Sequence, residues 1–128
     1  MAAEVLVVED DQAIREVIAQ ALLDEGYLVH EATNGQLALE LLHTHPSRLV
    51  VLLDVLMPVM GGFEVLQIVT ENPALLTRHA YVLLAATKRT PPPDVAALIE
   101  QHHIPFILKP FEMEDFLAAV DKAASTLE

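Results

Sequence analysis

The clearest structural signal in the chain lies in residues 49–62, which read Leu49-Val50-Val51-Leu52-Leu53-Asp54-Val55-Leu56-Met57-Pro58-Val59-Met60-Gly61-Gly62. The first five residues are all aliphatic, too few to cross a membrane and too uniformly apolar for a strand with one exposed face. They predict a strand buried on both faces, as in a parallel sheet covered by helices. Asp54 follows directly, before a turn marked by a proline and two glycines. Because open α/β sheets bind ligands at the carboxyl ends of their strands, Asp54 is a candidate functional residue, with a turn or helix-capping aspartate as the alternative.

The rest of the chain alternates short apolar runs with segments of helical periodicity. Strands are predicted at 5–8, 27–31, 49–53, 81–85 and 106–108, and helices at 14–22 (capped by Asp11), 33–42 (capped by Thr33), 62–71, 95–102 and 113–127. The Asn72-Pro73 pair should end the third helix, since a residue before proline avoids the helical region. This order predicts an α/β fold of five βα units, with a parallel sheet between two helical layers. We expect one domain over residues 1–128, without a linker or repeat.

Composition excludes several classes of function. The formal net charge is −12, whereas nucleic-acid binding needs clustered Lys and Arg, and anionic membranes also attract basic surfaces. The chain has no cysteine, which excludes disulfides and thiolate chemistry. No apolar run approaches the length of a spanning helix, and the N-terminus does not resemble a secretion signal. We therefore expect a cytoplasmic protein that binds neither nucleic acid nor membrane directly.

Four charged residues are predicted at the carboxyl ends of strands: Glu9, Asp10, Asp54 and Lys109. If the first, third and fifth strands lie side by side, these groups converge on one shallow cleft. Two carboxylates about 4 Å apart repel by roughly 4 kcal/mol at an effective dielectric of about 20, so the cluster should hold protons or a cation. Oxygen ligands without a nearby His or Cys favour Mg²⁺. A lysine beside such a site suits a phosphoryl group, whose charge needs partners on several sides.

The histidines give a weaker signal. His43, His45, His102 and His103 are candidates for a metal site, but no acid or cysteine accompanies them at ligand spacing in the sequence. We therefore expect exposed histidines without a metal.

Three motifs, in order, resemble those of the response-regulator receiver domain, and the likeness covers the whole chain. They are Val7-Val8-Glu9-Asp10-Asp11, Leu53-Asp54-Val55-Leu56-Met57-Pro58 through Gly62, and Leu108-Lys109-Pro110-Phe111. The resemblance implies a doubly wound, flavodoxin-like three-layer sandwich with strand order 2-1-3-4-5. It also implies a cis peptide bond before Pro110.

The resemblance assigns a role to each charged residue. Asp54 would accept a phosphoryl group from the phosphohistidine of a sensor histidine kinase or a histidine phosphotransfer protein. Glu9 and Asp10 would place Mg²⁺, with Asp54 and the backbone carbonyl of Leu56 as further ligands. Lys109 would pair with the phosphoryl oxygens.

The sequence departs from the family pattern at the switch positions. The family usually has Ser or Thr followed by Ala at the end of its fourth strand. Alignment by strand puts Ala85 at the hydroxyl position, whereas counting back from Lys109 favours Thr87. We favour Ala85, because it continues the apolar strand. The fifth-strand aromatic residue is Phe106, which has no hydroxyl, and Gly61 stands where an acid is frequent.

The resemblance implies a phosphorylation-controlled signalling module with self-catalysed phosphoryl transfer and slow autodephosphorylation, rather than a classical enzyme. Its readout face for a downstream effector, and a candidate face for homodimers, would comprise the fourth helix, fifth strand and fifth helix of the family fold. A first alternative is a degenerate receiver acting as a constitutive interaction scaffold. An aspartate-nucleophile phosphatase is disfavoured because Leu56 stands where that class has a second Asp. A flavin or nucleotide domain is disfavoured because acids follow the first strand.

Overall fold

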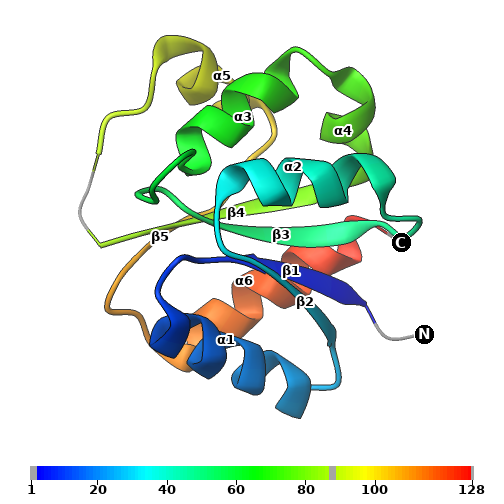
Figure 1. Cartoon of the computed structure of the whole chain (residues 1–128), viewed down its shortest axis with the longest axis vertical. Helices are drawn as coiled ribbons and strands as arrows, with labels where there is room; N and C mark the ends of the chain where they lie inside the picture. Colours follow the sequence, from blue (N-terminus) through cyan, green and yellow to red (C-terminus); the bar gives the residue numbers. More distant parts are fainter. Residues whose placement is uncertain (1–2, 87–88, 128) are drawn as a thin grey trace.

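A parallel five-stranded sheet runs through the centre of the computed structural model, which describes residues 3–86 and 89–127 (Figure 1). The strand order is β2-β1-β3-β4-β5. The strands are β1 (Glu4–Val8), β2 (Leu28–Ala32), β3 (Leu49–Asp54), β4 (Ala80–Ala85) and β5 (Phe106–Leu108). The predicted fold class and strand order are confirmed.

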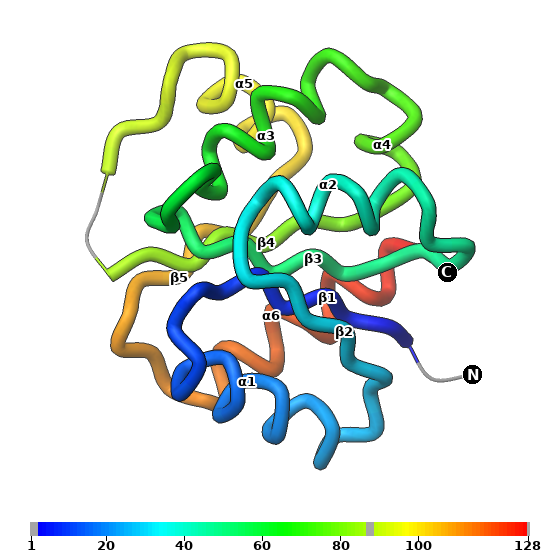
Figure 2. The backbone as a smooth tube through the Cα atoms, viewed as in Figure 1, coloured from blue at the N-terminus to red at the C-terminus, as the bar shows by residue number. Residues whose placement is uncertain are grey.

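Helices cover both faces of the sheet. They are α1 (Gln12–Asp24), α2 (Gly35–Thr44), α3 (Gly62–Thr70), α4 (Pro73–Arg78), α5 (Pro93–Gln101) and α6 (Met113–Ser125). The backbone tube shows α1 and α6 on one side of the sheet and α2 to α5 on the other (Figure 2). Within the described ranges, no helix is long and apolar enough to cross a membrane.

The aliphatic run of β3 explains the two-sided core. All six residues of β3 are buried, and alternate side chains enter opposite layers. Val51 and Leu53 pack with α2, α3, α4 and α5, whereas Val50 and Leu52 pack with α1 and α6. Each fully buried aliphatic side chain contributes about 1.5–3 kcal/mol. This central strand therefore gives Asp54, its last residue, a rigid support.

Backbone pairing continues beyond the strands and fixes the loops that carry the charged residues. Val8 pairs with Leu53, so β1 and β3 end at the same edge of the sheet. The amide of Glu9 donates to the carbonyl of Ala32 at 3.1 Å, and that of Lys109 donates to Ala85 at 2.7 Å. The first residue after each of these strands is thus held by the sheet.

One of the two predicted helix caps is wrong. Asn34, not Thr33, caps α2, because its side chain accepts a hydrogen bond from the amide of Leu37 at 3.0 Å. Asp11 caps α1 as predicted, accepting from Ile14 at 3.0 Å. Of the three strands that precede the charged residues, β1 and β3 are neighbours and β4 separates β3 from β5, as the order 2-1-3-4-5 requires.

The short helix α4 was not predicted. Asn72-Pro73 follows the end of α3 as expected, but Pro73 then occupies the first turn of a new helix, where its missing N–H costs nothing. His79, the residue after α4, joins this helix to the core. The amide of Leu49 donates to Nδ1 of buried His79 at 3.0 Å, and His79 Nε2 lies 3.2 Å from the carbonyl of Leu42. Burial lowers the pKa of His79, so the neutral ring can accept at one nitrogen and donate at the other.

Candidate functional site: an acidic cluster with a lysine

Three carboxylates meet at the carboxyl edge of the sheet. Glu9 and Asp10 follow β1, and Asp54 ends β3. One oxygen from each lies within 4.8 Å of the others. Glu9 is 2% exposed and Asp54 7% exposed, whereas Asp10 is exposed. The cluster therefore has two acids anchored in the protein and a third at its open side.

Lys109 reaches this cluster from two strands away. Its Nζ donates to Glu9 Oε1 at 2.8 Å and lies 3.6 Å from Asp54 Oδ2. The long lysine side chain spans the intervening strand β4, so Lys109 joins the acids although β5 is not adjacent to β3. The predicted convergence of the four side chains is confirmed, while their chemical roles stay predictions.

Arg15 also supports the cluster, and sequence reasoning missed it. Its Nη1 donates to the backbone carbonyl of Glu9 at 2.9 Å, and its Nε donates to Glu31 at 2.9 Å. The amide of Asp11 donates to Glu9 Oε2 at 3.3 Å. The signal was a lone arginine in the first turns of the helix that follows the acids. These contacts fix both the backbone and the carboxylate of Glu9.

The electrostatics of the cluster favour a cation. Asp10 is exposed, but partial desolvation of its carboxyl group, together with the adjacent Glu9 carboxylate, raises its pKa. Ionised Asp10 is therefore unfavourable in this setting, and one lysine does not offset three acids. A divalent cation at the open side would remove this repulsion.

Two glycines shape the turn after Asp54. A Cβ on Gly61 would lie 2.3 Å from the carbonyl oxygen of Val55, and one on Gly62 would lie 2.8 Å from that of Asp54. Both distances are too short, so this close return of the chain requires glycine. Leu56 lies in the turn between Asp54 and these glycines. Its side chain is 65% exposed and apolar, so its backbone carbonyl is the group it can offer to a metal.

The same turn contains a strained residue. Val59 has φ of 70°, and the amide of Met60 donates to the carbonyl of Pro58 at 2.8 Å. This is a γ-turn with a positive central φ, which is rare and unfavourable for a β-branched residue. The loop beside Asp54 is therefore held in a conformation that its sequence does not favour.

Of the two switch candidates, only Ala85 lies in the described part of the chain; Thr87 lies outside it. Ala85 ends β4, is 2% exposed and pairs with Leu108 of β5. Phe106 is half-buried, with its ring centroid 6.1 Å from that of Phe63.

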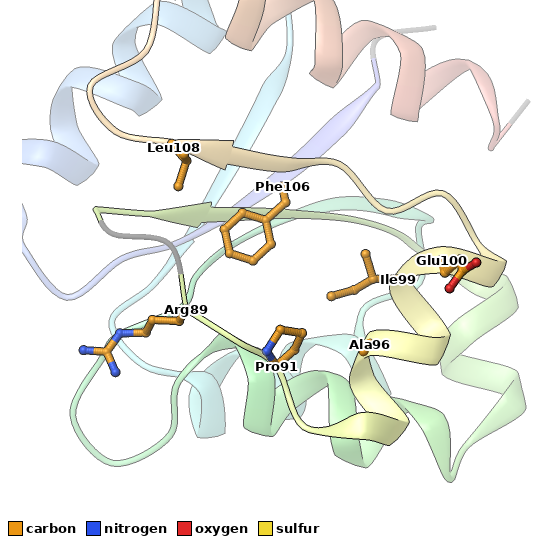
Figure 3. A pocket seen from close by; sticks show the side chains of 7 residues that line it. All are labelled: Arg89, Pro91, Ala96, Ile99, Glu100, Phe106 and Leu108. Carbon is orange, nitrogen blue, oxygen red and sulfur yellow. The ribbon is translucent and has the colours of Figure 1, made fainter.

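Phe106 also lines a largely apolar hollow of about 480 Å³ between β5 and α5 (Figure 3). The lining residues are Arg89, Pro91, Ala96, Ile99, Glu100, Phe106 and Leu108. The hollow lies on the face that the resemblance implies for readout, where α5 takes the place of the family's fourth helix and α6 that of its fifth. The peptide bond between Lys109 and Pro110 is cis, as predicted.

The donor set fits Mg²⁺. Its oxygens come from three carboxylates, and within the described ranges no histidine or cysteine joins them. Mg²⁺ prefers oxygen ligands and keeps several waters, which suits a cluster with one open side.

Comparison with known proteins agrees with this geometry. The family model described as the response regulator receiver domain matches residues 5–121. Response regulator MprA of Mycobacterium ulcerans is 34% identical over 119 residues, covering 92% of this chain and 48% of MprA. The chain thus spans about half the length of this relative.

Solved structures show the same likeness. A CheY-like response regulator receiver domain protein from Methanospirillum hungatei has a TM-score of 0.79 and 30% identity, covering 97% of this chain and 96% of that one. Chemotaxis protein CheY4 of Vibrio cholerae has a TM-score of 0.77 and 27% identity, covering 96% and 99%. On the family match and the shared strand order, the chain belongs to the response-regulator receiver domain family.

Proposed function

We propose that this domain accepts a phosphoryl group on Asp54 in a Mg²⁺-dependent reaction and thereby switches a protein-interaction face. The observation that carries the proposal is the position of Asp54: a mostly buried carboxylate, within 4.8 Å of two further acids and 3.6 Å from the Lys109 ammonium. A buried acid between a cation-binding pair and a lysine suits a nucleophile for phosphoryl transfer.

The residues divide the chemistry among them. An Asp54 oxygen forms a bond to phosphorus while the bond from phosphorus to the donor's imidazole nitrogen breaks, and the electron pair of that bond stays on the imidazole. Lys109 pairs with a phosphoryl oxygen, and Arg15 holds the Glu9 backbone. Mg²⁺, held by Glu9, Asp10, Asp54 and the Leu56 carbonyl, would neutralise phosphoryl charge. Hydrolysis of the acyl phosphate would slowly reset the domain.

The donor is a sensor histidine kinase or a histidine phosphotransfer protein, and the output is a downstream effector. Family membership supports these partners. The readout face comprises α5, β5 and α6, including the hollow lined by Phe106, and is also the candidate homodimer face. Residues 1–128 act as one receiver domain.

A specific observation favours a second candidate function, a constitutive interaction scaffold. Ala85 ends β4 without a hydroxyl, so it offers no side-chain hydrogen bond to a phosphoryl group. The four charged residues favour the phosphoacceptor, because a scaffold has no need for clustered, repelling acids.

Acetyl phosphate separates the two candidates. Incubation with acetyl phosphate and Mg²⁺ should add one phosphoryl group to the wild type, measured by intact-protein mass spectrometry, and chelation of Mg²⁺ should suppress it. Asp54→Asn should abolish the adduct, while Asp24→Asn, at an exposed acid of α1, should keep it. An adduct that persists on Asp54→Asn contradicts the assignment, and no adduct on the wild type favours the scaffold.

A further inference from the structure

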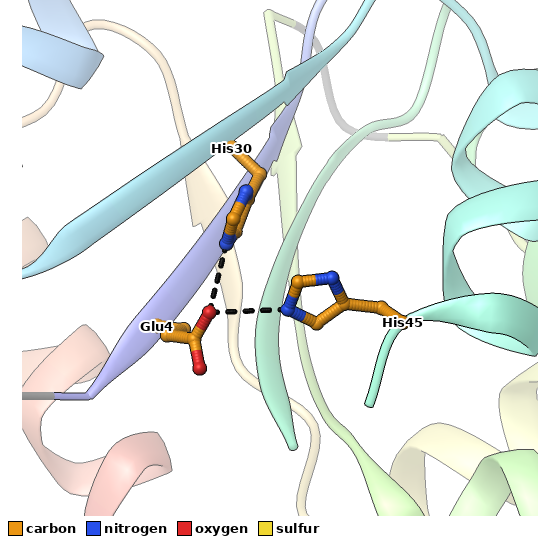
Figure 4. A group of neighbouring side chains, drawn as sticks. All are labelled: Glu4, His30 and His45. Carbon is orange, nitrogen blue, oxygen red and sulfur yellow. Dashed lines mark hydrogen bonds and ion pairs between the residues drawn. The ribbon is translucent and has the colours of Figure 1, made fainter. Parts of the chain in front are cut away.

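A second cluster of polar side chains lies at the amino-terminal ends of the strands, where β1 begins. Glu4 Oε1 lies 2.9 Å from His30 Nε2 and 3.1 Å from His45 Nε2. The two rings meet edge to face, with centroids 4.6 Å apart. Figure 4 shows both imidazoles directed at the same carboxylate oxygen. His45 is therefore half-buried against an acid, rather than exposed as expected.

Three separate elements build this cluster. Glu4 begins β1 and pairs with Leu28 of β2, so His30, two residues further along β2, lies on the same face of the sheet. His45 follows α2, and Arg78 of α4 donates to its backbone carbonyl at 3.1 Å. The carboxylate and both rings are thus placed by the sheet and by a held loop.

We propose that Glu4, His30 and His45 form a binding site for a divalent transition-metal ion of the Zn²⁺ type. Two imidazole nitrogens and a carboxylate oxygen are a common set for such ions. Ligands about 2.0–2.1 Å from a tetrahedral Zn²⁺ lie roughly 3.3–3.4 Å apart. The two distances from Glu4 to the rings are within about 0.5 Å of this value, so a small side-chain adjustment admits the ion.

The protonation states also suit a metal. The Ser47 hydroxyl and the two histidines lower the pKa of Glu4 to about 2, so its carboxylate is ionised at neutral pH. The metal displaces the Nε2 proton of each ring, so each bound imidazole is neutral, ligates the ion through Nε2 and carries its one proton on Nδ1. The side chains of His30, His45 and Glu4 are 34%, 16% and 18% exposed, which leaves access for the ion and for a water as a fourth ligand.

The site is distinct from the acidic cluster in place and in chemistry. Glu4 begins β1 and Glu9 follows its last residue, so five residue steps of strand separate them by roughly 17 Å. The nitrogen donors favour Zn²⁺ and similar ions, whereas the all-oxygen cluster suits Mg²⁺. A metal here would link β1, β2 and the loop between α2 and β3, and would stabilise the folded chain by mass action.

Zinc titration in excess Mg²⁺ tests the site. With millimolar Mg²⁺ present for the acidic cluster, calorimetry should show one Zn²⁺ bound per chain. Histidine side-chain proton–nitrogen correlation spectra should show the ring signals of His30 and His45 shifting together. His30→Gln and His45→Gln should each weaken Zn²⁺ binding at least about tenfold, since even indirect partners of ligands matter by 10–100-fold.

Two controls make the result specific. His102→Gln, at an exposed residue after α5, should leave the Zn²⁺ affinity unchanged. Asp10→Asn should also leave it unchanged, which excludes binding at the acidic cluster. Equal affinity in wild type, His30→Gln and His45→Gln overturns the proposal. So does a wild type whose His30 and His45 signals stay fixed at millimolar Zn²⁺, a readout that needs no folded variant.

Discussion

The closest acidic partner of the Lys109 ammonium is Glu9, at 2.8 Å, rather than Asp54, at 3.6 Å. In the metal-free domain the lysine thus offsets the charge of a buried acid that would help to hold Mg²⁺. Lys109 and a bound Mg²⁺ would therefore both neutralise the negative charge of Glu9.

Lys109→Ala leaves Glu9 buried without its cation. Removing one partner of a buried pair typically costs about 3–5 kcal/mol, and because the Lys109 side chain is 17% exposed we expect about 2–3 kcal/mol. Mg²⁺ should restore more stability to this variant than it adds to the wild type, as measured by urea unfolding. Lys122→Ala, at an exposed residue of α6, is the control. Equal losses in the two variants would show that the Glu9 contact contributes nothing.

Asp10→Asn removes one of three repelling charges. The variant should melt above the wild type without divalent cations, because the raised pKa of Asp10 reports an unfavourable ionised state at neutral pH. Mg²⁺ should raise the melting temperature of the wild type and raise that of the variant less. The same Mg²⁺ response in both proteins rules out Asp10 as a ligand.

Val59→Gly should stabilise the domain. Val59 has φ of 70° and is 72% exposed, so glycine relieves backbone strain and loses little burial. The strain of about 1–3 kcal/mol, less the greater unfolded-state entropy of glycine, predicts a net gain of about 0.5–1.5 kcal/mol. Val17→Gly, at a 61% exposed residue within α1, should instead destabilise by roughly 1 kcal/mol. Chemical unfolding of both variants checks these opposite signs, and a destabilised Val59→Gly would contradict the strain.

Glu4 should contribute stability that acid removes. Its pKa is about 2 in the folded protein and ordinarily 4.5. The contribution is therefore complete above about pH 4.5 and declines as the pH falls toward 2. Each unit of pKa difference corresponds to about 1.4 kcal/mol, and solvent screening reduces this, so we expect about 1–2 kcal/mol.

The measurement compares wild type and Glu4→Gln by urea unfolding at pH 5 and pH 3. The wild type should be more stable at pH 5, and its advantage should shrink at pH 3. Glu40→Gln, at an exposed acid of α2, is the matched control. An advantage independent of pH would show that Glu4 acts through packing rather than charge.

Ala85→Thr should strengthen signal transmission. A hydroxyl at the end of β4 can donate to a phosphoryl group on Asp54, and a hydrogen bond to a charged group is worth roughly 1.5–3 kcal/mol, or tenfold and more in population. Amide spectra with and without beryllofluoride should show larger shifts over residues 95–117 in Ala85→Thr than in the wild type. Thr87→Val should change them little. Loss of the shifts in Thr87→Val would instead assign the switch to Thr87.

Local patterns predicted the elements that build the acidic cluster. The aliphatic run 49–53 could only be a buried strand, and the acids after two strands had to meet at one edge once the sheet was parallel. The resemblance supplied the strand order, which periodicity does not contain. Lys109 reaches the acids although β4 lies between β5 and β3, because a lysine side chain is long enough to cross a strand.

What escaped prediction depends on contacts distant in sequence. Glu4 and His45 are 41 residues apart, so no spacing rule connects them. The helix α4 is only six residues long, and it starts at Pro73, which in the sequence marks the end of the preceding helix. Arg15 was a single charge in a helix until its hydrogen bond to the Glu9 carbonyl gave it a role.

The helix α4 also limits how the chain can be redesigned. The connection from α3 to β4 looks like a segment that a simple turn could replace. However, three sets of hydrogen bonds depend on it. Arg78 secures the loop of His45, His79 bridges Leu49 and Leu42, and the Tyr81 hydroxyl donates to the Leu75 carbonyl at 2.9 Å. Deletion of residues 72–79 would therefore remove the hydrogen bonds that hold the segment leading into the central strand β3. Insertions and fusions should be placed elsewhere on the domain.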